Sequence, residues 1–331
     1  MKKILVTGGA GYIGSFIVRS LREAGFDPYI VDNFYSGHKE AVSRFPIEGI
    51  DLVAQKDKLQ KLFEKEKFTG VIHMASFLEV EESYLNPLKY FDNNLKGAVN
   101  LLSVMKECGV KLFVFSSSAA VYGTPKKVPI KEDFPKNPES PYGETKLMIE
   151  RMLPWCEKSW GLKYVAIRYF NAAGAAMDGS IGANHKNPTH LIPNVIKKAL
   201  NGETLKIFGG DYQTLDGTCV RDYIHVLDLG ENHTLAMSGL IDGIESQVLN
   251  AGSGRGYSNL EIVKMVERVT GLNVKKKVVD RRPGDPSKLV ASIDKIGKLL
   301  DWKPKYNLSD IISSAYLWYK NHPNGYTKKE K

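Results

Sequence analysis

Tyr142 and Lys146 lie four residues apart in the segment 141–146, which reads Pro-Tyr-Gly-Glu-Thr-Lys. Four residues span about one helical turn, so this spacing places a phenol and an ammonium on the same face of a helix. A nearby positive charge favours the phenolate and lowers the pKa of a tyrosine. The pair could therefore remove a proton from a substrate hydroxyl. The same spacing also occurs on solvated helix faces, so its meaning depends on the rest of the chain.

A glycine-rich turn occupies positions 7–14, which read Thr-Gly-Gly-Ala-Gly-Tyr-Ile-Gly. It follows a predicted strand and opens a predicted helix, the context in which glycines let the backbone approach a dinucleotide pyrophosphate. Two overlapping spacings fit this function. Gly9, Gly11 and Gly14 form one, and Gly8, Gly11 and Gly14 form the other. The sequence leaves open which glycine faces the phosphates.

Asp32 closes the second predicted strand. It follows the glycine turn by about twenty residues, the place where a carboxylate accepts hydrogen bonds from an adenine ribose. The same negative charge would repel a 2'-phosphate. The sequence therefore predicts NAD as the cofactor in preference to NADP.

The elements that must position these groups follow from the alternation of short apolar runs with longer amphipathic stretches. This alternation predicts a parallel sheet covered on both faces. The expected fold class is α/β, with a Rossmann-type doubly wound sheet. The expected strands are Lys3 to Thr7, Pro28 to Asp32, Ile50 to Val53, Val71 to Met74, Leu112 to Ser116 and Tyr164 to Arg168, and the expected helices are Tyr12 to Ala24, Lys58 to Lys67, Asn93 to Cys108 and Pro141 to Trp160.

The length of 331 residues favours one large domain with a smaller partner. After Asn171 the chain becomes rich in Gly, Asn and Pro and its elements shorten. We therefore expect an NAD-binding domain at 1–171 and a smaller α/β substrate domain at 172–331, the two being interwoven because no flexible linker separates them.

Composition narrows the range of partners. The net charge is +9, but the lysines alternate with glutamates and leucines. The basic clusters Lys275–Lys277 and Lys328–Lys329 lack the interleaved aromatic residues on which bases stack. We therefore expect no nucleic-acid partner. No apolar run is long enough to cross a membrane or form a signal peptide, which predicts a cytoplasmic protein with no membrane partner. Three widely separated cysteines argue against a disulfide framework or a metal site.

Further segments carry a family resemblance. With the glycine turn, Asp32, a serine block at 116–118 and the Tyr-Lys pair in this order, the chain resembles the extended short-chain dehydrogenase/reductase superfamily over nearly its whole length. Within it, the chain looks most like the UDP-galactose 4-epimerase family. This likeness rests on segments 11–15, 92–94, 116–123, 168–171, 216–226 and 281–285.

The resemblance implies a Rossmann domain that holds NAD tightly and a smaller domain that binds a UDP-sugar. Tyr142 would take the proton of the sugar 4-hydroxyl, Lys146 would lower the pKa of Tyr142 and hold the nicotinamide ribose, and Ser118 would hydrogen-bond the reacting oxygen. The implied reaction, in galactose and nucleotide-sugar metabolism, is epimerisation at C4 through a transient 4-keto sugar. UDP-galactose and UDP-glucose are the expected substrates.

The family pattern also implies the remaining contacts, residue by residue. The expected substrate-binding residues are Ser118, Tyr142, Asn171, His190, Leu191, Arg221, Arg282 and Asp285. The expected cofactor-binding residues are Gly8, Gly11, Tyr12, Ile13, Gly14, Asp32, Asn33, Asn93, Ser116, Tyr142, Lys146 and Tyr169. From the sequence alone, the two arginines could instead form surface ion pairs, and Asn171 could be a turn residue.

Four places depart from the family pattern. Leu78 stands where many epimerases have a lysine, Glu81 replaces a glycine, and the segment 36–38 is shortened beside the adenine ribose. Leu289 falls where many members carry a bulky tyrosine that limits the pocket to sugars without an N-acetyl group. A smaller leucine could admit N-acetylated sugars, so we expect activity on both kinds.

Several alternatives remain open at this stage. A 4,6-dehydratase needs an acid where this chain has Ala119 and Ala120, which disfavours that reaction. Epimerases of UDP-N-acetylglucosamine or UDP-glucuronate stay as the second choice, and a non-catalytic NAD-sensing protein would be expected to lack the serine or the Tyr-Lys pair. The helices expected at 93–108 and 141–160 form a homodimer interface in the family, although burial within one subunit would explain their apolar faces equally well.

Overall fold

The computed structural model of the chain describes residues 1–184, 190–282 and 285–326. Lys328 and Lys329, weighed above as a nucleic-acid contact, lie outside these ranges, as do Pro283 and Gly284 of the 281–285 segment.

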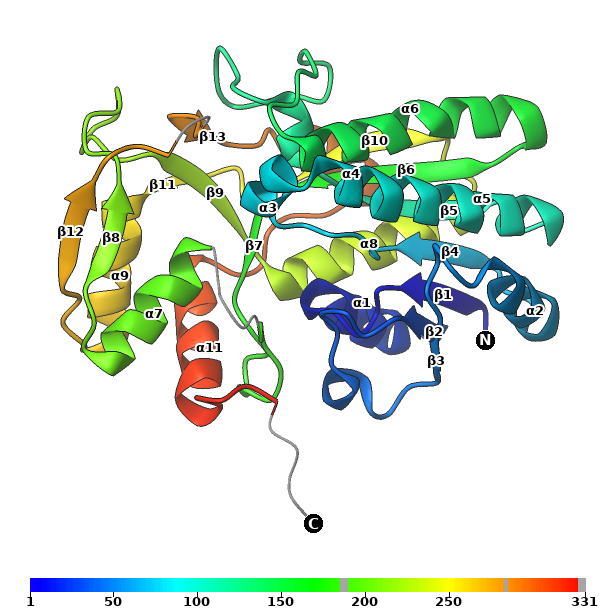
Figure 1. The fold of residues 1–331 in the computed structure, drawn as a ribbon, viewed down its shortest axis with the longest axis horizontal. Helices are drawn as coiled ribbons and strands as arrows, with labels where there is room; N and C mark the ends of the chain where they lie inside the picture. Colours follow the sequence, from blue (N-terminus) through cyan, green and yellow to red (C-terminus); the bar gives the residue numbers. More distant parts are fainter. Residues whose placement is uncertain (185–189, 283–284, 327–331) are drawn as a thin grey trace.

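The larger part of the molecule is built on a seven-stranded sheet in which every pairing is parallel (Figure 1). Its inner strands are apolar on both faces, as in Ile4, Leu5 and Val6, which are fully buried. Such strands need cover on both sides, which is the condition that produces a parallel sheet. The predicted doubly wound fold is confirmed. In spatial order the strands are β10 (Gln247–Ala251), β6 (Lys163–Tyr169), β5 (Leu112–Ser118), β4 (Gly70–His73), β1 (Lys3–Thr7), β2 (Asp27–Asp32) and β3 (Ile47–Gly49).

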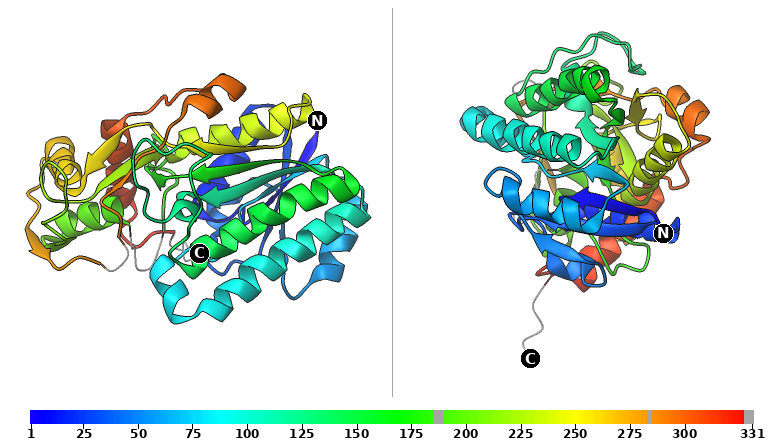
Figure 2. Two further views of the ribbon diagram at one scale, coloured as in Figure 1. Left: turned by 90° about the horizontal axis from the view of Figure 1, so that it is seen from above. Right: turned by 90° about the vertical axis from the view of Figure 1, so that its right-hand side faces the viewer.

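Helices cover both faces of this sheet (Figure 2). One face carries α2 (Lys56–Glu66), α5 (Gly97–Glu107) and α6 (Pro141–Trp160), and the other carries α1 (Tyr12–Glu23) and α8 (Val226–Ile241). The short helices α3 (Val80–Leu85) and α4 (Pro87–Tyr90) and a π-helical turn (Phe91–Lys96) lead into α5. The chain order reverses between β4 and β1, and open parallel sheets bind ligands at the carboxyl ends of the strands beside such a point.

The smaller part lies beyond the carboxyl ends of these strands (Figure 1). The chain after residue 171 contributes to both parts, because β10 and α8 return to the large sheet. The smaller part contains a four-stranded sheet, a two-stranded sheet and the helices packed on them. The four-stranded sheet consists of β7 (Asn171–Ala173), β9 (Val220–His225), β11 (Gly256–Ser258) and β13 (Lys288–Leu289), and the two-stranded sheet consists of β8 (Leu205–Phe208) and β12 (Lys276–Val279). The helices of this part are α7 (Leu191–Asn201), α9 (Asn259–Thr270) and α11 (Leu308–Asn321). Helix α10 (Asp294–Leu300) instead lies against β10 and α8 of the larger part.

Two expected elements need correction. The strand expected at Ile50 to Val53 is wrong, because the edge strand lies at Ile47–Gly49. Asp51 ends the extended conformation, since its Oδ1 accepts hydrogen bonds from the Val53 and Ala54 amides at 2.8 and 3.0 Å and turns the chain. The helix expected at Asn93 to Cys108 is regular only from Gly97, because its first turn is a π-helix.

Three buried histidines make the stability of the fold dependent on pH. Burial lowers the pKa of His73 to about 3 and the pKa values of His225 and His233 to about 4. Because these values lie below that of an unfolded histidine, each ring contributes stability that is complete above about pH 6.5 and is lost as the pH falls. Asp228 cancels the effect of about one of these histidines. Burial raises the pKa of Asp228 to about 6, so the folded protein takes up this proton before the unfolded chain does, and acidification stabilises the fold at this group.

We therefore expect the free energy of unfolding to fall by about 3 kcal/mol per pH unit between pH 6 and 5, because the unfolded chain binds about two more protons there. Denaturant titrations across this range measure the slope. Asn in place of His225 keeps an N-cap acceptor for the Leu227 amide but cannot titrate, so His225→Asn should reduce the slope by about 1 kcal/mol per pH unit. Stability that is constant or rises on acidification would contradict this expectation.

Candidate active site

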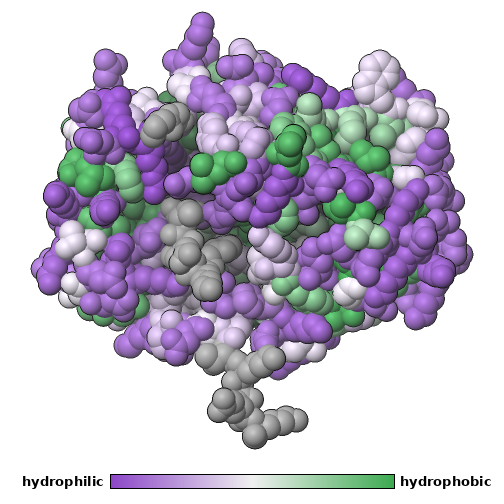
Figure 3. Space-filling model, in the orientation of Figure 1, coloured by the Kyte–Doolittle hydropathy of each residue, from purple (hydrophilic) through white to green (hydrophobic). Residues whose placement is uncertain are grey.

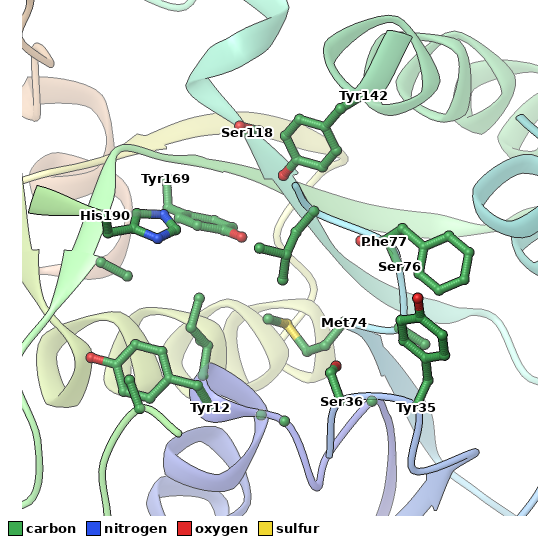
Figure 4. Close-up of a pocket in the computed structure, with 18 of the residues that line it drawn as sticks. Tyr12, Tyr35, Ser36, Met74, Ser76, Phe77, Ser118, Tyr142, Tyr169 and His190 are labelled. Atoms are coloured by element: carbon green, nitrogen blue, oxygen red, sulfur yellow. The ribbon is translucent and has the colours of Figure 1, made fainter. Parts of the chain in front are cut away.

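One cavity of about 370 Å³ opens at the carboxyl ends of the large sheet, between the two parts of the molecule (Figure 4). The glycine turn after β1 and the segment after β2 line one end. The residues that follow β4, β5 and β6 line its middle, together with the first turns of α6 and α7. Groups from distant parts of the sequence therefore face one another across a single space.

The glycine turn adopts the second of its two possible spacings. Gly8, Gly11 and Gly14 line the cavity. Gly8 has a φ of +70°, and a Cβ there would lie 2.7 Å from the Ala75 amide nitrogen, so a side chain is excluded. A Cβ on Gly14 would lie 2.2 Å from the Gly8 carbonyl oxygen, which accounts for the close packing of α1 on this turn. Gly9 packs against Ile30 of β2 instead.

Asp32 lies at the end of β2, and its carboxylate faces the cavity next to the glycine turn. Its two oxygens accept hydrogen bonds from the Ala10 and Phe34 amides at 3.0 and 2.8 Å. Burial raises the pKa of Asp32, and these two amide bonds oppose the rise. The glycine cradle, the first amides of α1 and a carboxylate held at this distance along the chain fit the pyrophosphate and adenine ribose of NAD.

Tyr142 and Lys146 occupy the first turns of α6, on the face turned toward the sheet. The helix begins here because Ser140 accepts a hydrogen bond from the Gly143 amide at 3.1 Å and Pro141 takes the first helical position. Tyr142 is 4% exposed and Lys146 is 2% exposed. The Tyr142 hydroxyl points into the cavity (Figure 4).

The electrostatics of the pair differ from the expectation. Burial raises the pKa of Tyr142, and hydrogen bonds from Ser118 and Tyr169 only oppose this rise. The predicted lowering of this pKa by Lys146 is therefore wrong for the protein chain taken alone, because the cost of burying a phenolate is larger. Burial also lowers the pKa of Lys146 to about 7. Its Nζ lies 5.8 Å from the centre of the Tyr142 ring and donates to Ser76 Oγ at 2.9 Å and the Ser116 carbonyl at 2.8 Å.

The three consecutive serines of β5 have different surroundings. Successive side chains of a strand point to opposite faces, so Ser117 lies on one face of the sheet and Ser116 on the other. Ser117 donates to Glu150 of α6 at 2.5 Å, and Ser116 contacts His233 of α8 on the other face at 3.2 Å. Ser118 ends the strand and lines the cavity, and its Oγ accepts from the Ala120 amide at 3.1 Å. The geometry thus places Ser118, the serine selected from the sequence, beside Tyr142.

Most of the expected cofactor residues line the cavity, and two lie behind it. These two are Ser116 and Lys146. Ser116 is 1% exposed, and the Lys146 ammonium is held inside the protein by the Ser116 carbonyl and the Ser76 side chain. The expected cofactor residues found on the cavity wall are Gly8, Gly11, Tyr12, Ile13, Gly14, Asp32, Asn33, Asn93, Tyr142 and Tyr169.

The expected substrate residues form two groups. Ser118, Tyr142, Asn171 and His190 line the cavity, as does Leu289, whereas Leu191 begins α7 immediately before the lining residues Ile192 and Pro193. Arg221, Arg282 and Asp285 lie beyond the cavity wall in the smaller part.

Arg221 of β9 is paired with Leu289 of β13, which lines the cavity. The Arg221 guanidinium, which is largely buried, forms an ion pair with Asp285. The Arg282 guanidinium lies 4.0 Å from the centre of the Phe208 ring. The Arg221 guanidinium is therefore already paired with a carboxylate, and both arginines lie outside the wall of the cavity.

The sequence reasoning missed the segment 74–77, which follows β4 and lines the middle of the cavity (Figure 4). Ser76 holds the Lys146 ammonium and is its clearest functional member. The segment is mostly apolar and carries no motif. Its position after a central parallel strand was the signal that could have identified it.

Within the described part of the chain, no group of three or more His, Cys, Asp or Glu side chains is arranged to hold a metal ion. Among the helices of that same part, none has the length and apolar character needed to cross a membrane.

A parallel sheet whose carboxyl edge carries a glycine turn, an acidic residue and a Tyr-Lys pair defines the class of short-chain, dinucleotide-dependent enzymes. The chain belongs to the NAD dependent epimerase/dehydratase family, whose sequence profile matches residues 4–252. The resemblance inferred from the motifs is thereby confirmed, and NAD is the cofactor of this family.

Among individual relatives, the UDP-glucose 4-epimerase of Lactobacillus helveticus is 48% identical over 99% of this chain and 100% of its own length. The crystal structure of UDP-glucose 4-epimerase from Bifidobacterium longum in complex with NAD+ and UDP has a TM-score of 0.92 and 36% identity, covering 98% of this chain and 100% of that one. The UDP-Glc/GlcNAc 4-epimerase of Campylobacter jejuni has a TM-score of 0.84 and 40% identity, covering 97% of this chain and 100% of that one.

Proposed function

We propose that this protein interconverts UDP-galactose and UDP-glucose by NAD-dependent epimerisation at C4 of the hexose. The observation that carries the proposal is that one cavity unites the Gly8-Gly11-Gly14 cradle and Asp32 with Ser118 and Tyr142. A dinucleotide site and a proton-transfer site thus share one wall. The Lactobacillus helveticus relative, a UDP-glucose 4-epimerase at 48% identity, supports the same reaction.

In this reaction Tyr142 takes the proton of the sugar 4-hydroxyl and later returns it to the oxygen of the 4-keto sugar. NAD, when bound, would supply the acceptor for the hydride of C4 and the donor of the same hydride to the 4-keto sugar. Ser118 hydrogen-bonds the reacting oxygen from its place beside Tyr142. Lys146, held by Ser76 and the Ser116 carbonyl, keeps an ammonium near the phenol and would contact the nicotinamide ribose.

The UDP portion would be anchored in the smaller part of the molecule. Arg221 and Arg282 would bind the diphosphate, because a guanidinium pairs with phosphate oxygens through two parallel hydrogen bonds. Asp285, which is the ion-pair partner of Arg221, would accept hydrogen bonds from the uridine ribose. Asn171 and His190 lie on the same cavity wall as Tyr142.

The test is to incubate the purified protein with UDP-galactose without adding NAD and to follow UDP-glucose by NMR. Formation of UDP-glucose to a steady ratio, with no oxidised product, supports an epimerase that carries its own NAD. Accumulation of NADH together with an oxidised sugar would identify a dehydrogenase and overturn the proposal.

We also propose that N-acetylated UDP-hexoses are accepted, because Leu289 leaves more room in the cavity than a tyrosine would. The Campylobacter jejuni relative is described as acting on both glucose and N-acetylglucosamine forms.

We expect Leu289→Tyr to lower kcat/KM for UDP-N-acetylgalactosamine by about 10–100-fold, since steric exclusion acts on the larger sugar alone. The same variant should change kcat/KM for UDP-galactose less than about threefold. Steady-state kinetics on both sugars measure this ratio. A wild-type enzyme that turns over only UDP-galactose would contradict it.

We infer that two copies associate through α5 and α6. Val99 on α5 and Trp155 on α6 are 48% and 70% exposed, and Met148 on α6 adds a third apolar side chain to this surface. Figure 3 shows apolar side chains among polar ones where these helices lie in Figure 1.

We expect Trp155→Glu to convert a dimer into a monomer, because a charge would be buried at the interface. Light scattering after gel filtration measures the mass, and a monomeric wild type would refute the inference.

We further infer a cytoplasmic location. Cys108, Cys156 and Cys219 are all free thiols. Free cysteines are typical of reducing compartments. Fractionation of the source cells would test the inference.

A further inference from the structure

Residues 174–184, which we call the strap, leave β7 and run past the first turn of α1 (Figure 1). Ile181 of the strap is buried in the same hydrophobic cluster as the inner face of α1. The Tyr12 hydroxyl, at the start of α1, donates to the Gly174 carbonyl at 2.7 Å. Gly174 and Ala183 also line the cavity together with the glycine turn. The strap is therefore part of the cavity wall next to the groups that fit the NAD pyrophosphate.

The smaller part of the molecule holds two consecutive residues near the end of the strap. The hydroxyl of Tyr326, which follows α11, accepts from the Gly182 amide at 3.2 Å and donates to the Gly182 carbonyl at 3.1 Å. The indole of Trp318 on α11 donates to the Ala183 carbonyl at 3.0 Å. A Cβ on Gly182 would lie 2.4 Å from the Trp318 ring, so the strap can approach α11 this closely only at a glycine. Because these bonds are made to backbone groups, they fix the path of the strap itself.

The larger part holds the next residue of the strap through His38. The His38 amide donates to the Ala10 carbonyl of the glycine turn at 2.9 Å. Its Nε2 lies 3.3 Å from the Asn184 carbonyl oxygen and 3.2 Å from Asn184 Nδ2. Nε2 donates to the carbonyl in one tautomer and accepts from the amide in the other, so either tautomer keeps a bond to Asn184. The strap is thereby tied, through His38, to the turn that would bind the pyrophosphate.

We propose that the strap retains NAD, and that the cofactor is released only when Tyr326 and His38 let go of residues 182–184. A segment that covers a bound ligand must open before the ligand leaves, and each bond present only in the closed state slows that opening. Retention requires only NAD, the cofactor of the family, and does not depend on which sugar is bound. Under the proposed function it also costs no turnover, because an epimerase regenerates NAD in every cycle and has no need to exchange it.

The test measures the release of NAD from the purified full-length protein with no UDP-sugar present. An NAD glycohydrolase destroys each NAD that leaves, and the NAD still bound is measured at intervals. Tyr326→Phe keeps the ring contacts with His38 and Trp318, at 5.0 and 4.8 Å between centres, but removes both bonds to Gly182. We expect this variant to release NAD about tenfold faster than the wild type, the effect of one to two net hydrogen bonds. His38→Ala acts from the opposite side of the strap and should accelerate release by about three- to tenfold.

Two further variants serve as controls. Tyr316→Phe removes a hydroxyl from α11 outside the strap contacts and should release NAD at the wild-type rate. His38→Gln should release NAD more slowly than His38→Ala, because its side-chain amide can still bond Asn184.

Hydrogen exchange of the wild type gives a readout that needs no variant. The amides of residues 176–184 should exchange faster once NAD has been removed, since the strap would then open more often. Wild-type release rates in folded Tyr326→Phe and His38→Ala, or strap exchange that NAD does not change, would overturn the proposal. A wild type that retains NAD through the strap but epimerises no UDP-sugar would overturn the proposed function alone.

Discussion

Replacement of Tyr142 by phenylalanine is expected to lower kcat for C4 epimerisation by roughly 10²–10⁴-fold, the usual contribution of a positioned general acid or base. The phenol points into the cavity next to Ser118, and phenylalanine keeps its ring packing while removing the only atom that can carry the proton. Because the ring remains, the protein should fold normally and retain NAD. Single-turnover kinetics with UDP-galactose, together with the amount of nucleotide released on denaturation, measure both expectations.

Tyr319→Phe is the matched control for this variant. Tyr319 lines the same cavity from α11, in the smaller part of the molecule. Loss of its hydroxyl should leave kcat within about threefold of the wild type, since Tyr319 acts on Tyr12 of the glycine turn and is not among the groups that act on Tyr142. Full activity in Tyr142→Phe would show that another group is the base, and loss of NAD from that variant would indicate a structural defect.

The second large effect is expected on stability, from the ion pair that lies behind the reactive helix. Glu150 of α6 and Arg168 of β6 have side chains that are 5% and 3% exposed. The guanidinium donates to both carboxylate oxygens, at 2.9 Å from Nε and 2.5 Å from Nη2, and Ser117 donates to the same carboxylate. Glu150→Leu would leave a buried guanidinium without its counter-charge. We expect the free energy of unfolding to fall by about 3–5 kcal/mol, as measured by denaturant titration at neutral pH.

An exposed ion pair provides the control. Arg22 and Asp27 form a pair whose side chains are 42% and 32% exposed, so Asp27→Asn should cost less than about 1 kcal/mol. The double variant Glu150→Leu/Arg168→Met should be more stable than Glu150→Leu alone, because no unpaired charge remains buried. A double variant that is less stable than the single one would show that the hydrogen bonds of Arg168 to Tyr122 and the Glu132 carbonyl outweigh the charge.

The sequence predicted the limits of a strand or helix best where one local signal set them. The limits of β1 and α6 agree with those expected, because β1 is an unbroken apolar run and α6 starts at Ser140-Pro141. The expectation at Ile50 to Val53 was wrong because an apolar run there is overridden by the local turn of Asp51. The π-helical turn before α5 has no signature in the apolar pattern.

The candidate site was predictable only in part. Family motifs selected Ser118, Tyr142, Asn171 and Asp32, and all four line the cavity. The same reasoning missed Ser76, because a serine in an apolar segment carries no motif.

By itself the sequence determined the chemistry available to this protein. Spacing along one helix put Tyr142 and Lys146 on one face, and Asp32 after a glycine turn predicted NAD, because both patterns lie within a single element or two adjacent ones. Only the tertiary structure decided that Gly8 and not Gly9 faces the cavity, that the serines of β5 divide between two faces, and that burial raises the pKa of Tyr142. These outcomes depend on how elements far apart in the chain pack together, and a side chain's desolvation and hydrogen-bond partners are set by that packing.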